Sequence, residues 1–316
     1  VTFAALRAAP HPLAELPDIP SPRSDDFQIA LWALQEMSFR PLDSVHRGWE
    51  NESSLAELRR RLEQCQEAEL RAELFQPASG NVIETLEALA TGGDGPSLSQ
   101  WMEDNGALVH MREFVLHRAP YQLKEADAHS FAIPRLPAGR AKSALLKIQL
   151  DEYGDTESGE SHQELFAATM DAVGVALDID TIPAVTLRTN TVLNTLGTQR
   201  RLLGALLGHL AVFELTSVTP MSRYATTLRR LLPTAAANDA ARFFDVHVSA
   251  DAFHGRIAIE EMIDGFLELY PDEADDVVFG AAAVTAVEGE FSRHLLQSWD
   301  AELSSLRNAE PTRAAA

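Results

Sequence analysis

Cysteine is almost absent from this chain, with Cys65 as the only one among 316 residues. A single cysteine cannot form an internal disulfide, and it excludes a structural zinc site built from several thiolates. The chain also lacks the run of about 20 apolar residues that a membrane-spanning helix needs. The nearest run, 202–215, is shorter and contains His209 and Glu214. No signal-peptide pattern follows Val1, so we expect a cytoplasmic protein.

Positive charge is scarce as well. The chain has 26 Lys and Arg residues against 47 Asp and Glu residues, which gives a formal net charge of −21. Such a chain repels phosphate backbones and anionic lipid, so we expect neither nucleic acid nor a membrane among its partners. We interpret the acidity as a source of solubility rather than as the sign of a specific partner.

Several common catalytic motifs are missing. The sequence contains no dinucleotide-binding GxGxxG, no phosphate-binding P-loop, no HExxH and no GxSxG nucleophile turn. It also contains no Glu-x-x-His pair, which argues against a ferritin-like diiron bundle.

Helical periodicity dominates what the chain does contain, and we predict an all-α fold. A proline-rich irregular arm comes first, and beyond it apolar residues recur at three- and four-residue steps. A glycine-rich stretch at 92–96 predicts a loop. The expected helices, with boundaries uncertain by about 2–4 residues, are 25–40, 53–74, 97–125, 139–153, 161–175, 196–231, 235–268 and 273–306.

The strongest chemical signal is the trio His247, Asp251 and His254. At about 100° per residue, Asp251 lies about 40° from His247 and His254 about 20° away on the other side, so one helix face carries all three. The two histidines are about 10 Å apart along the axis, which suits two metals better than one. Imidazole with carboxylate and without thiolate favours iron or manganese.

Two alternatives to this interpretation remain open. Phe244, Val246, Val248 and Ala250 alternate as in a strand, which would suit a mononuclear facial triad on a barrel. Helix-forming residues on both sides, with no turn signal between them, favour the helix. The second alternative is a polar face turned to solvent, and the large apolar neighbours in the motif argue against it.

A diiron site needs more ligands from other helices, because carboxylates must balance the metal charge. Glu214 ends a long apolar run, and a carboxylate buried among such neighbours is almost never left unpaired. A salt bridge to Arg200, Arg201 or Arg223 is the alternative explanation for Glu214.

Glu152 and His162 form the next candidate pair. On one straight helix they would lie about 15 Å apart, but the glycines between them permit a break that brings both side chains inward. An ordinary acidic loop is the alternative. Glu113 and His117, four residues apart on a predicted helix, are another source of one glutamate and one histidine.

The order of these residues resembles the haem-oxygenase-like diiron oxidase/oxygenase superfamily, and within it the proteins known as iron-containing redox enzymes. The resemblance extends over 100–300. It rests mainly on Asp-Glu152-Tyr-Gly, His162-x-x-Leu-Phe, Glu214 and His247-x3-Asp251-x2-His254.

This resemblance implies a haem-oxygenase-like helical bundle without haem. The resemblance leaves the amino-terminal third unaccounted for. We expect residues 97–316 to form the metal-binding core and residues 1–96 an amino-terminal arm with helices that pack on it, as one compact unit. Two Fe(II) ions would be bound, one of them weakly, and Glu113 and His117 would line the pocket or support the ligands. The implied ligands are His162, Glu214 and His254 for one iron, and Glu152, His247 and Asp251 for the other.

The resemblance also implies an O2-dependent oxidase or oxygenase. We expect N-oxygenation of an amine or amino acid in specialised metabolism. The alternatives are oxidative C–C bond cleavage of a carboxylic or amino acid, a mononuclear iron enzyme, an iron-binding protein without oxygenase activity, and a helical interaction module. The expected partners are a small-molecule substrate and an external electron donor, and a homodimer is left open.

Overall fold

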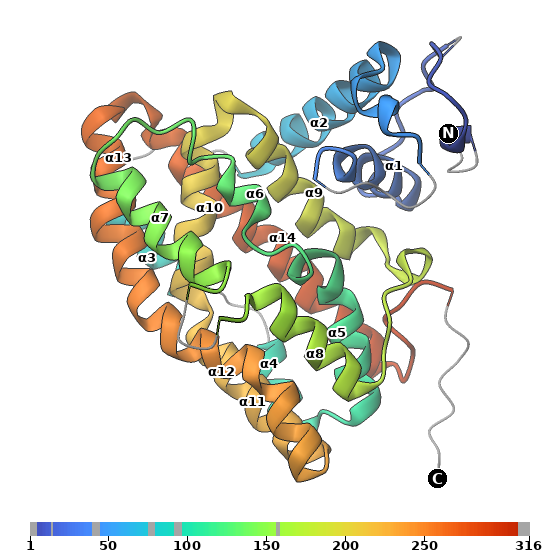
Figure 1. Ribbon diagram of the computed structural model, residues 1–316, viewed down its shortest axis with the longest axis vertical. Coiled ribbons are helices and arrows are strands. Elements are labelled where there is room, and N and C mark those ends of the chain that lie inside the picture. Colours follow the sequence, from blue (N-terminus) through green and yellow to red (C-terminus); the bar gives the residue numbers. More distant parts are fainter. Residues whose placement is uncertain are drawn as a thin grey trace.

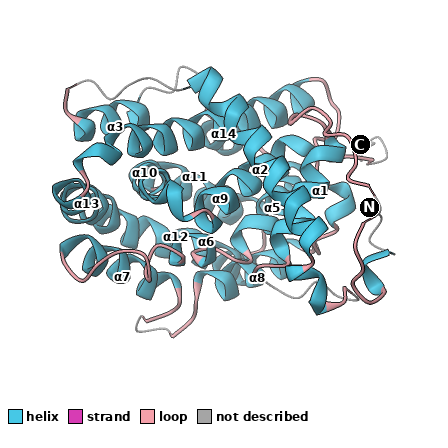
Figure 2. Ribbon diagram, turned by 90° about the horizontal axis from the view of Figure 1, so that it is seen from above, coloured by secondary structure: helices cyan, strands magenta, loops and turns pink. Residues whose placement is uncertain are grey.

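The computed structural model describes residues 5–13, 15–39, 45–74, 80–91, 97–155 and 159–308. Within these ranges the chain forms helices joined by turns, and it contains no strand (Figure 1, Figure 2). The predicted all-α fold is therefore confirmed. The glycine-rich loop expected at 92–96 lies outside the described residues.

The helices follow one another in this order: α1 (Asp25–Glu36), α2 (Ser53–Leu74), α3 (Val82–Thr91), α4 (Leu98–Asn105), α5 (Leu108–Gln122), α6 (Asp127–Ser130), α7 (Arg140–Glu152), α8 (His162–Val173), α9 (Ala184–Thr198), α10 (Leu203–Thr216), α11 (Val218–Leu231), α12 (Thr234–Ile257), a π-helical turn (Ala258–Ile263), α13 (Asp264–Leu269) and α14 (Ala274–Asp300). Short 3-10 turns occupy Ala5–Arg7, Arg47–Asn51, Ile179–Thr181, Arg200–Leu202 and Pro271–Glu273.

Several predicted boundaries hold, and three need correction. The helix expected at 97–125 is two helices, because the chain turns to an extended conformation at Gly106 after α4. The helix expected at 196–231 is also two, α10 and α11, which meet at a bend of 51°. The last helix ends at Asp300 rather than at 306.

Most of α9 lies outside the helices predicted from the sequence. This helix is rich in threonine and asparagine, residue types with modest helix propensity. Most of its residues are nevertheless buried, and it packs against α1 and α14. Tertiary packing therefore outweighs local propensity in this helix.

Two apolar clusters make up most of the core. One is formed largely by α7, α9, α10 and α14, and the other by α4, α5, α8, α11, α12 and α14. The amino-terminal helices α1 and α2 form a smaller cluster of their own, and α1 also packs on α9. The domain boundary at residue 96 stays a prediction.

Glycines bring α10 and α14 unusually close together. A Cβ on Gly208 would lie 2.0 Å from the Val277 carbonyl oxygen, and one on Gly280 would lie 1.8 Å from the Ala205 carbonyl oxygen. Backbone atoms cannot yield as a flexible side chain can, so this crossing requires glycine. Among the described residues no single helix is long and apolar enough to cross a membrane, and α10 with α11 meets that test only as a bent pair.

The close crossing of α10 and α14 predicts that one added methyl group at Gly280 destabilises the fold. Gly280→Ala should lower the free energy of unfolding by about 3 kcal/mol, because the added Cβ overlaps backbone and forces α10 and α14 apart. Gly289→Ala on the same helix is the control, because its Cβ would meet nothing closer than Arg293 Nη2 at 3.9 Å. It should be neutral or stabilise by up to about 1 kcal/mol. Urea unfolding followed by circular dichroism measures both, and equal midpoints would contradict the prediction.

Candidate metal centre

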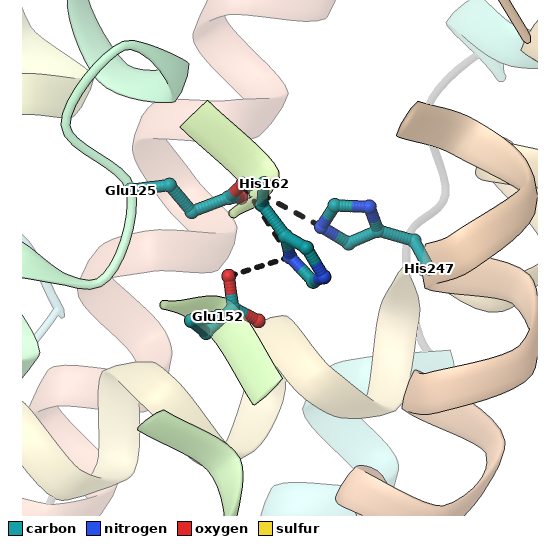
Figure 3. A group of neighbouring side chains, drawn as sticks. All are labelled: Glu125, Glu152, His162 and His247. Atoms are coloured by element: carbon teal, nitrogen blue, oxygen red, sulfur yellow. Dashed lines mark ion pairs between the residues drawn. The ribbon is translucent and has the colours of Figure 1, made fainter. Parts of the chain in front are cut away.

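Acidic and histidine side chains from separate parts of the chain meet between the two large apolar clusters. The ligand atoms of Glu125, Glu152, His162 and His247 lie within 4.8 Å of one another, and we call these four residues the Glu125 group (Figure 3). Glu152, Glu214 and His254 satisfy the same criterion, and we call them the Glu214 group. Glu152 belongs to both groups. The side chains therefore form two adjacent groups of candidate ligands that share one carboxylate.

The junction of α7 and α8 places Glu152 against His162. After α7, Gly154 adopts φ +90°, a left-handed conformation that favours glycine. A Cβ on Gly154 would also lie 2.9 Å from the backbone of Glu160 and of Ser161. Glycine thus lets the returning chain come close, and Glu152 Oε2 lies 2.7 Å from His162 Nδ1.

The start of α8 is fixed by a capping box. The Ser161 hydroxyl accepts a hydrogen bond from the Glu164 N–H, and the Glu164 carboxylate accepts one from the Ser161 N–H. His162 is therefore held as the first residue of α8. The predicted break before His162 is confirmed, except for residues 156–158, which lie outside the described part of the chain.

The motif on α12 is helical, and all three of its side chains are buried, so the strand alternative is wrong. Each histidine has one ring nitrogen engaged: His247 Nδ1 lies 2.7 Å from the Phe243 carbonyl oxygen. His254 Nε2 lies 2.8 Å from Asp151 Oδ2. A ring nitrogen that donates its proton to an oxygen leaves the other nitrogen free to bind metal, which is how protein ligands are usually oriented.

The remaining ring nitrogens of α12 face different glutamates. His247 Nε2 lies 3.5 Å from Glu125 Oε2, and His254 Nδ1 lies 3.5 Å from Glu214 Oε2. The ring of His162 lies beside that of His247, with 4.2 Å between their centroids. His162 is thus grouped with His247, whereas the resemblance places it on one iron with Glu214 and His254.

Asp251 lies beside the Glu214 group but is a member of neither the Glu214 group nor the Glu125 group. Its Oδ1 is 3.7 Å from His254 Nδ1. Burial opposes its charge, but His254, His247 and a hydrogen bond from Ser217 together lower the pKa of Asp251. Asp251 is therefore a charged carboxylate next to the second metal position.

Glu125 is the residue that sequence analysis missed. It comes from the turn between α5 and α6, so no helical spacing relates it to the other candidates. The next residue, Ala126, is buried with φ 72°, a left-handed conformation that costs a non-glycine residue about 1–2 kcal/mol. Strain of this kind often accompanies a functional site. Here it accompanies the turn that directs Glu125 inward.

The turn is held by a buried ion pair with the amino-terminal helix α1. The Lys124 ammonium contacts the Glu36 carboxylate, and both side chains are buried. The same ammonium lies 3.3 Å from Asn194 Oδ1 and 4.5 Å from the centre of the Phe39 ring. The residue before Glu125 is thus fixed by the amino-terminal third of the chain.

Four buried carboxylates dominate the electrostatics of the cluster, and they belong to Glu125, Glu152, Glu214 and Asp251. Burial raises the pKa of all three glutamates, because it disfavours their charged form. Burial lowers the pKa of His247, yet the neighbouring carboxylates, Glu125 foremost, raise it to about 10. Two divalent cations would balance four carboxylates, whereas one would leave net negative charge in an apolar interior.

The donor atoms themselves fit a metal. Buried polar atoms normally make well-directed hydrogen bonds, but six atoms of the cluster make none, although they lie close to one another. They are Glu152 Oε2, both ring nitrogens of His162, His247 Nε2, Asp251 Oδ1 and His254 Nδ1. Imidazole nitrogens and carboxylate oxygens without thiolate form a ligand set for iron or manganese.

Glu113 and His117 belong to a different network. The Glu113 carboxylate accepts hydrogen bonds from Trp299 Nε1 at 2.8 Å and from the Ser305 hydroxyl. His117 lies 2.7 Å from the Thr186 hydroxyl and 3.0 Å from that of Ser305. Both side chains thus have partners near the carboxyl-terminal end of α14. Neither of them joins the metal groups or lines the small cavity beside those groups.

The comparison with known families decides the class of protein. The family described as iron-containing redox enzyme matches residues 112–289, more than half of the chain. The chain belongs to this family. The matched segment contains every candidate ligand named above, so the resemblance based on the order of the motifs is confirmed. This iron-containing redox enzyme is accordingly an oxidoreductase, with buried His and Glu groups that fit iron.

Two individual proteins are also similar. Nitrosourea synthase from Streptomyces achromogenes subsp. streptozoticus is 28% identical over 138 residues, which are 42% of this chain and 29% of that protein. The chain therefore matches less than a third of the curated relative. A crystal structure of a CADD-like protein of unknown function from Nostoc punctiforme PCC 73102 has 18% identity and a TM-score of 0.53, covering 68% of this chain and 94% of the other. That likeness supports the fold alone.

Removal of the shared carboxylate should affect both metal positions. We expect wild-type protein to bind two equivalents of Fe(II), Glu214→Ala and Glu125→Ala to keep about one, and Glu152→Ala to bind neither tightly. Titration under nitrogen with Mössbauer readout measures this. Glu113→Gln is the matched control, a buried glutamate in another network, which should lose stability but keep both irons. A single equivalent in the wild type, unchanged in Glu152→Ala, would show a mononuclear site elsewhere.

The ion pair between Lys124 and Glu36 should influence the affinity for iron, although neither side chain is a candidate ligand. In Glu36→Gln the Lys124 ammonium loses its carboxylate partner, so the turn that directs Glu125 inward is held less firmly. We expect the affinity for one of the two irons to fall about tenfold, the scale seen when residues that support metal ligands are changed. Glu69→Gln is the control, because it breaks the ion pair with buried Arg188. Equal losses of iron affinity in both variants would mean a general effect of stability.

Proposed function

We propose that this oxidoreductase is an O2-dependent diiron oxygenase that hydroxylates the nitrogen of an amine or amino acid. The observation that carries the proposal is Glu152, whose carboxylate belongs to both metal-binding groups. A single metal would have no use for two adjacent sets of buried donors. The family supports the redox chemistry, and the similarity to a nitrosourea synthase favours nitrogen as the atom oxidised.

Seven side chains would hold the metals. The Glu125 group would bind one iron and the Glu214 group the other, with Asp251 beside the second. When bound, the irons supply the one-electron chemistry that activates O2. The protein's residues orient this set: the Phe243 carbonyl and Asp151 fix the rings of His247 and His254.

The proposed reaction is the hydroxylation of a primary amine at nitrogen. One amine R–NH2, one O2, two electrons and two protons give one hydroxylamine R–NHOH and one water. An N–H bond is broken and an N–O bond is formed, while the second oxygen atom is reduced to water. The electrons come from an external donor of the class of reduced flavins or ferredoxins. Apolar walls around the small cavity, including Leu210 and Phe213, limit the access of bulk water.

A single-turnover experiment tests the proposal. Protein loaded with two Fe(II) under nitrogen is mixed with an amine and isotopically labelled O2, and mass spectrometry follows the amine. We expect a product heavier by one labelled oxygen, with loss of this product in Glu152→Ala. A shortened carbon skeleton would instead show C–C bond cleavage. Oxidation of iron with no change in any amine would show an iron-binding protein without oxygenase activity.

A further inference from the structure

A large cavity of about 500 Å³ adjoins the candidate metal centre. Phe213, Ser217 and Met221 line both this cavity and the small one that contains Glu125, Glu152 and Glu214. The two spaces are thus neighbours that share three lining side chains. A volume of this size is in the range of small-molecule binding pockets, about 300–1,000 Å³.

Two polar side chains connect the cavity directly to the metal centre. Ser217, on its wall, donates from its hydroxyl to the Glu214 carbonyl oxygen at 3.3 Å and helps to lower the pKa of the neighbouring Asp251 carboxyl. Gln122, also on its wall, donates from its amide nitrogen to Glu125 Oε1 at 2.7 Å once the amide is oriented toward the carboxylate. The inner end of the cavity is therefore the end at which Ser217 and Gln122 lie.

The cavity is elongated along α5 and α14. Gln122, Arg118 and Phe114 occupy one face of α5 at four-residue spacing, and all three line the wall. At 1.5 Å per residue this stripe is about 12 Å long. Arg118 pairs with Glu288 on α14, so this ion pair joins α5 and α14 along the wall of the cavity. Ser292 on α14 lies further from the inner end, one helical turn beyond Glu288.

The walls are mainly apolar. Six aromatic side chains line them, from Phe114, Phe166, Phe213, Tyr224, Phe243 and Phe244. The half-buried charges of Arg118 and Glu288 form a bidentate pair that is neutral as a unit, and the Arg118 guanidinium also lies over the Phe291 ring at 4.5 Å. Arg293 is the other charged side chain on the wall, and it is exposed. A small, very polar substrate would leave these rings without contacts, whereas an apolar body would cover them.

We propose that this cavity binds the substrate, and that the substrate is a primary amine on an elongated alkyl or aromatic body. The assignment rests on the proposed function, because the amino group must be the group that is oxidised. The amino group lies at the inner end, where Ser217 and the acidic metal centre favour an N–H donor. The apolar body extends along α5 and α14 toward Ser292.

The affinity for n-alkylamines tests this assignment. Butylamine, hexylamine and octylamine are titrated by calorimetry into iron-loaded protein under nitrogen, so that no oxidation occurs. We expect the dissociation constant to fall about fourfold for each added methylene until the chain fills the cavity, because each methylene leaves water for an apolar wall. Equal dissociation constants for all three amines would overturn the assignment.

Tryptophan substitutions on α14 locate the bound chain. Ser292→Trp fills the outer end, so octylamine should lose its advantage over hexylamine while butylamine binds as before. Thr285→Trp fills the inner part and should weaken all three. Gln297→Trp, exposed on the same helix, is the control and should change nothing. Circular dichroism and iron content establish that each variant is folded and loaded. The comparison of the three amines in wild-type protein tests the assignment even if a variant does not fold.

The two proposals fail in different ways. If alkylamines bind with the expected length dependence but give no hydroxylamine in air, the cavity assignment stands and N-oxygenation is wrong. If a short polar amine such as ethanolamine gives a hydroxylamine, and no alkylamine binds or reacts, N-oxygenation stands and the cavity assignment is wrong.

Discussion

The cost of burying negative charge is the constraint on which this structure depends. Four carboxylates stand in an apolar interior, and an unbalanced buried charge is far more costly than any single packing defect. Protonation of the carboxyls, protonated histidines and metal cations are the ways to compensate so many carboxylates in so little space. The helix termini, the capping box and the strained turn all serve to bring these side chains together. Binding of iron and completion of the fold are therefore linked.

The supporting contacts lie well beyond the ligands. α1 reaches the turn of Glu125 through one buried ion pair, and the glycine crossing with α14 fixes α10, the helix that carries Glu214. A chain with all the ligands but without these contacts would place them less accurately. This gives the amino-terminal third a role that its sequence alone does not reveal.

The sequence predicts those parts of the site that follow from local geometry. His247, Asp251 and His254 share a face because a helix has a fixed period, and Glu152 meets His162 because glycines break the chain between them. Glu125 could not be found in this way, since a turn residue has no period. The division of ligands between two metals depends on distances between helices, which no spacing within one helix contains. α9 was not predicted because its threonine and asparagine residues have modest helix propensity, and packing on α1 and α14 stabilises the helix.

The π-helical turn after α12 has a further consequence. A π turn holds one residue more than an α turn, so everything after it is rotated by about 100° relative to an unbroken helix. This segment packs on α7, the helix that ends in Glu152. Loss of one residue between Ala258 and Ile263 would keep every ligand and every motif spacing in the sequence. It would still shift Glu152 relative to His254, so the same ligand spacing in a sequence is compatible with different distances between the two candidate groups.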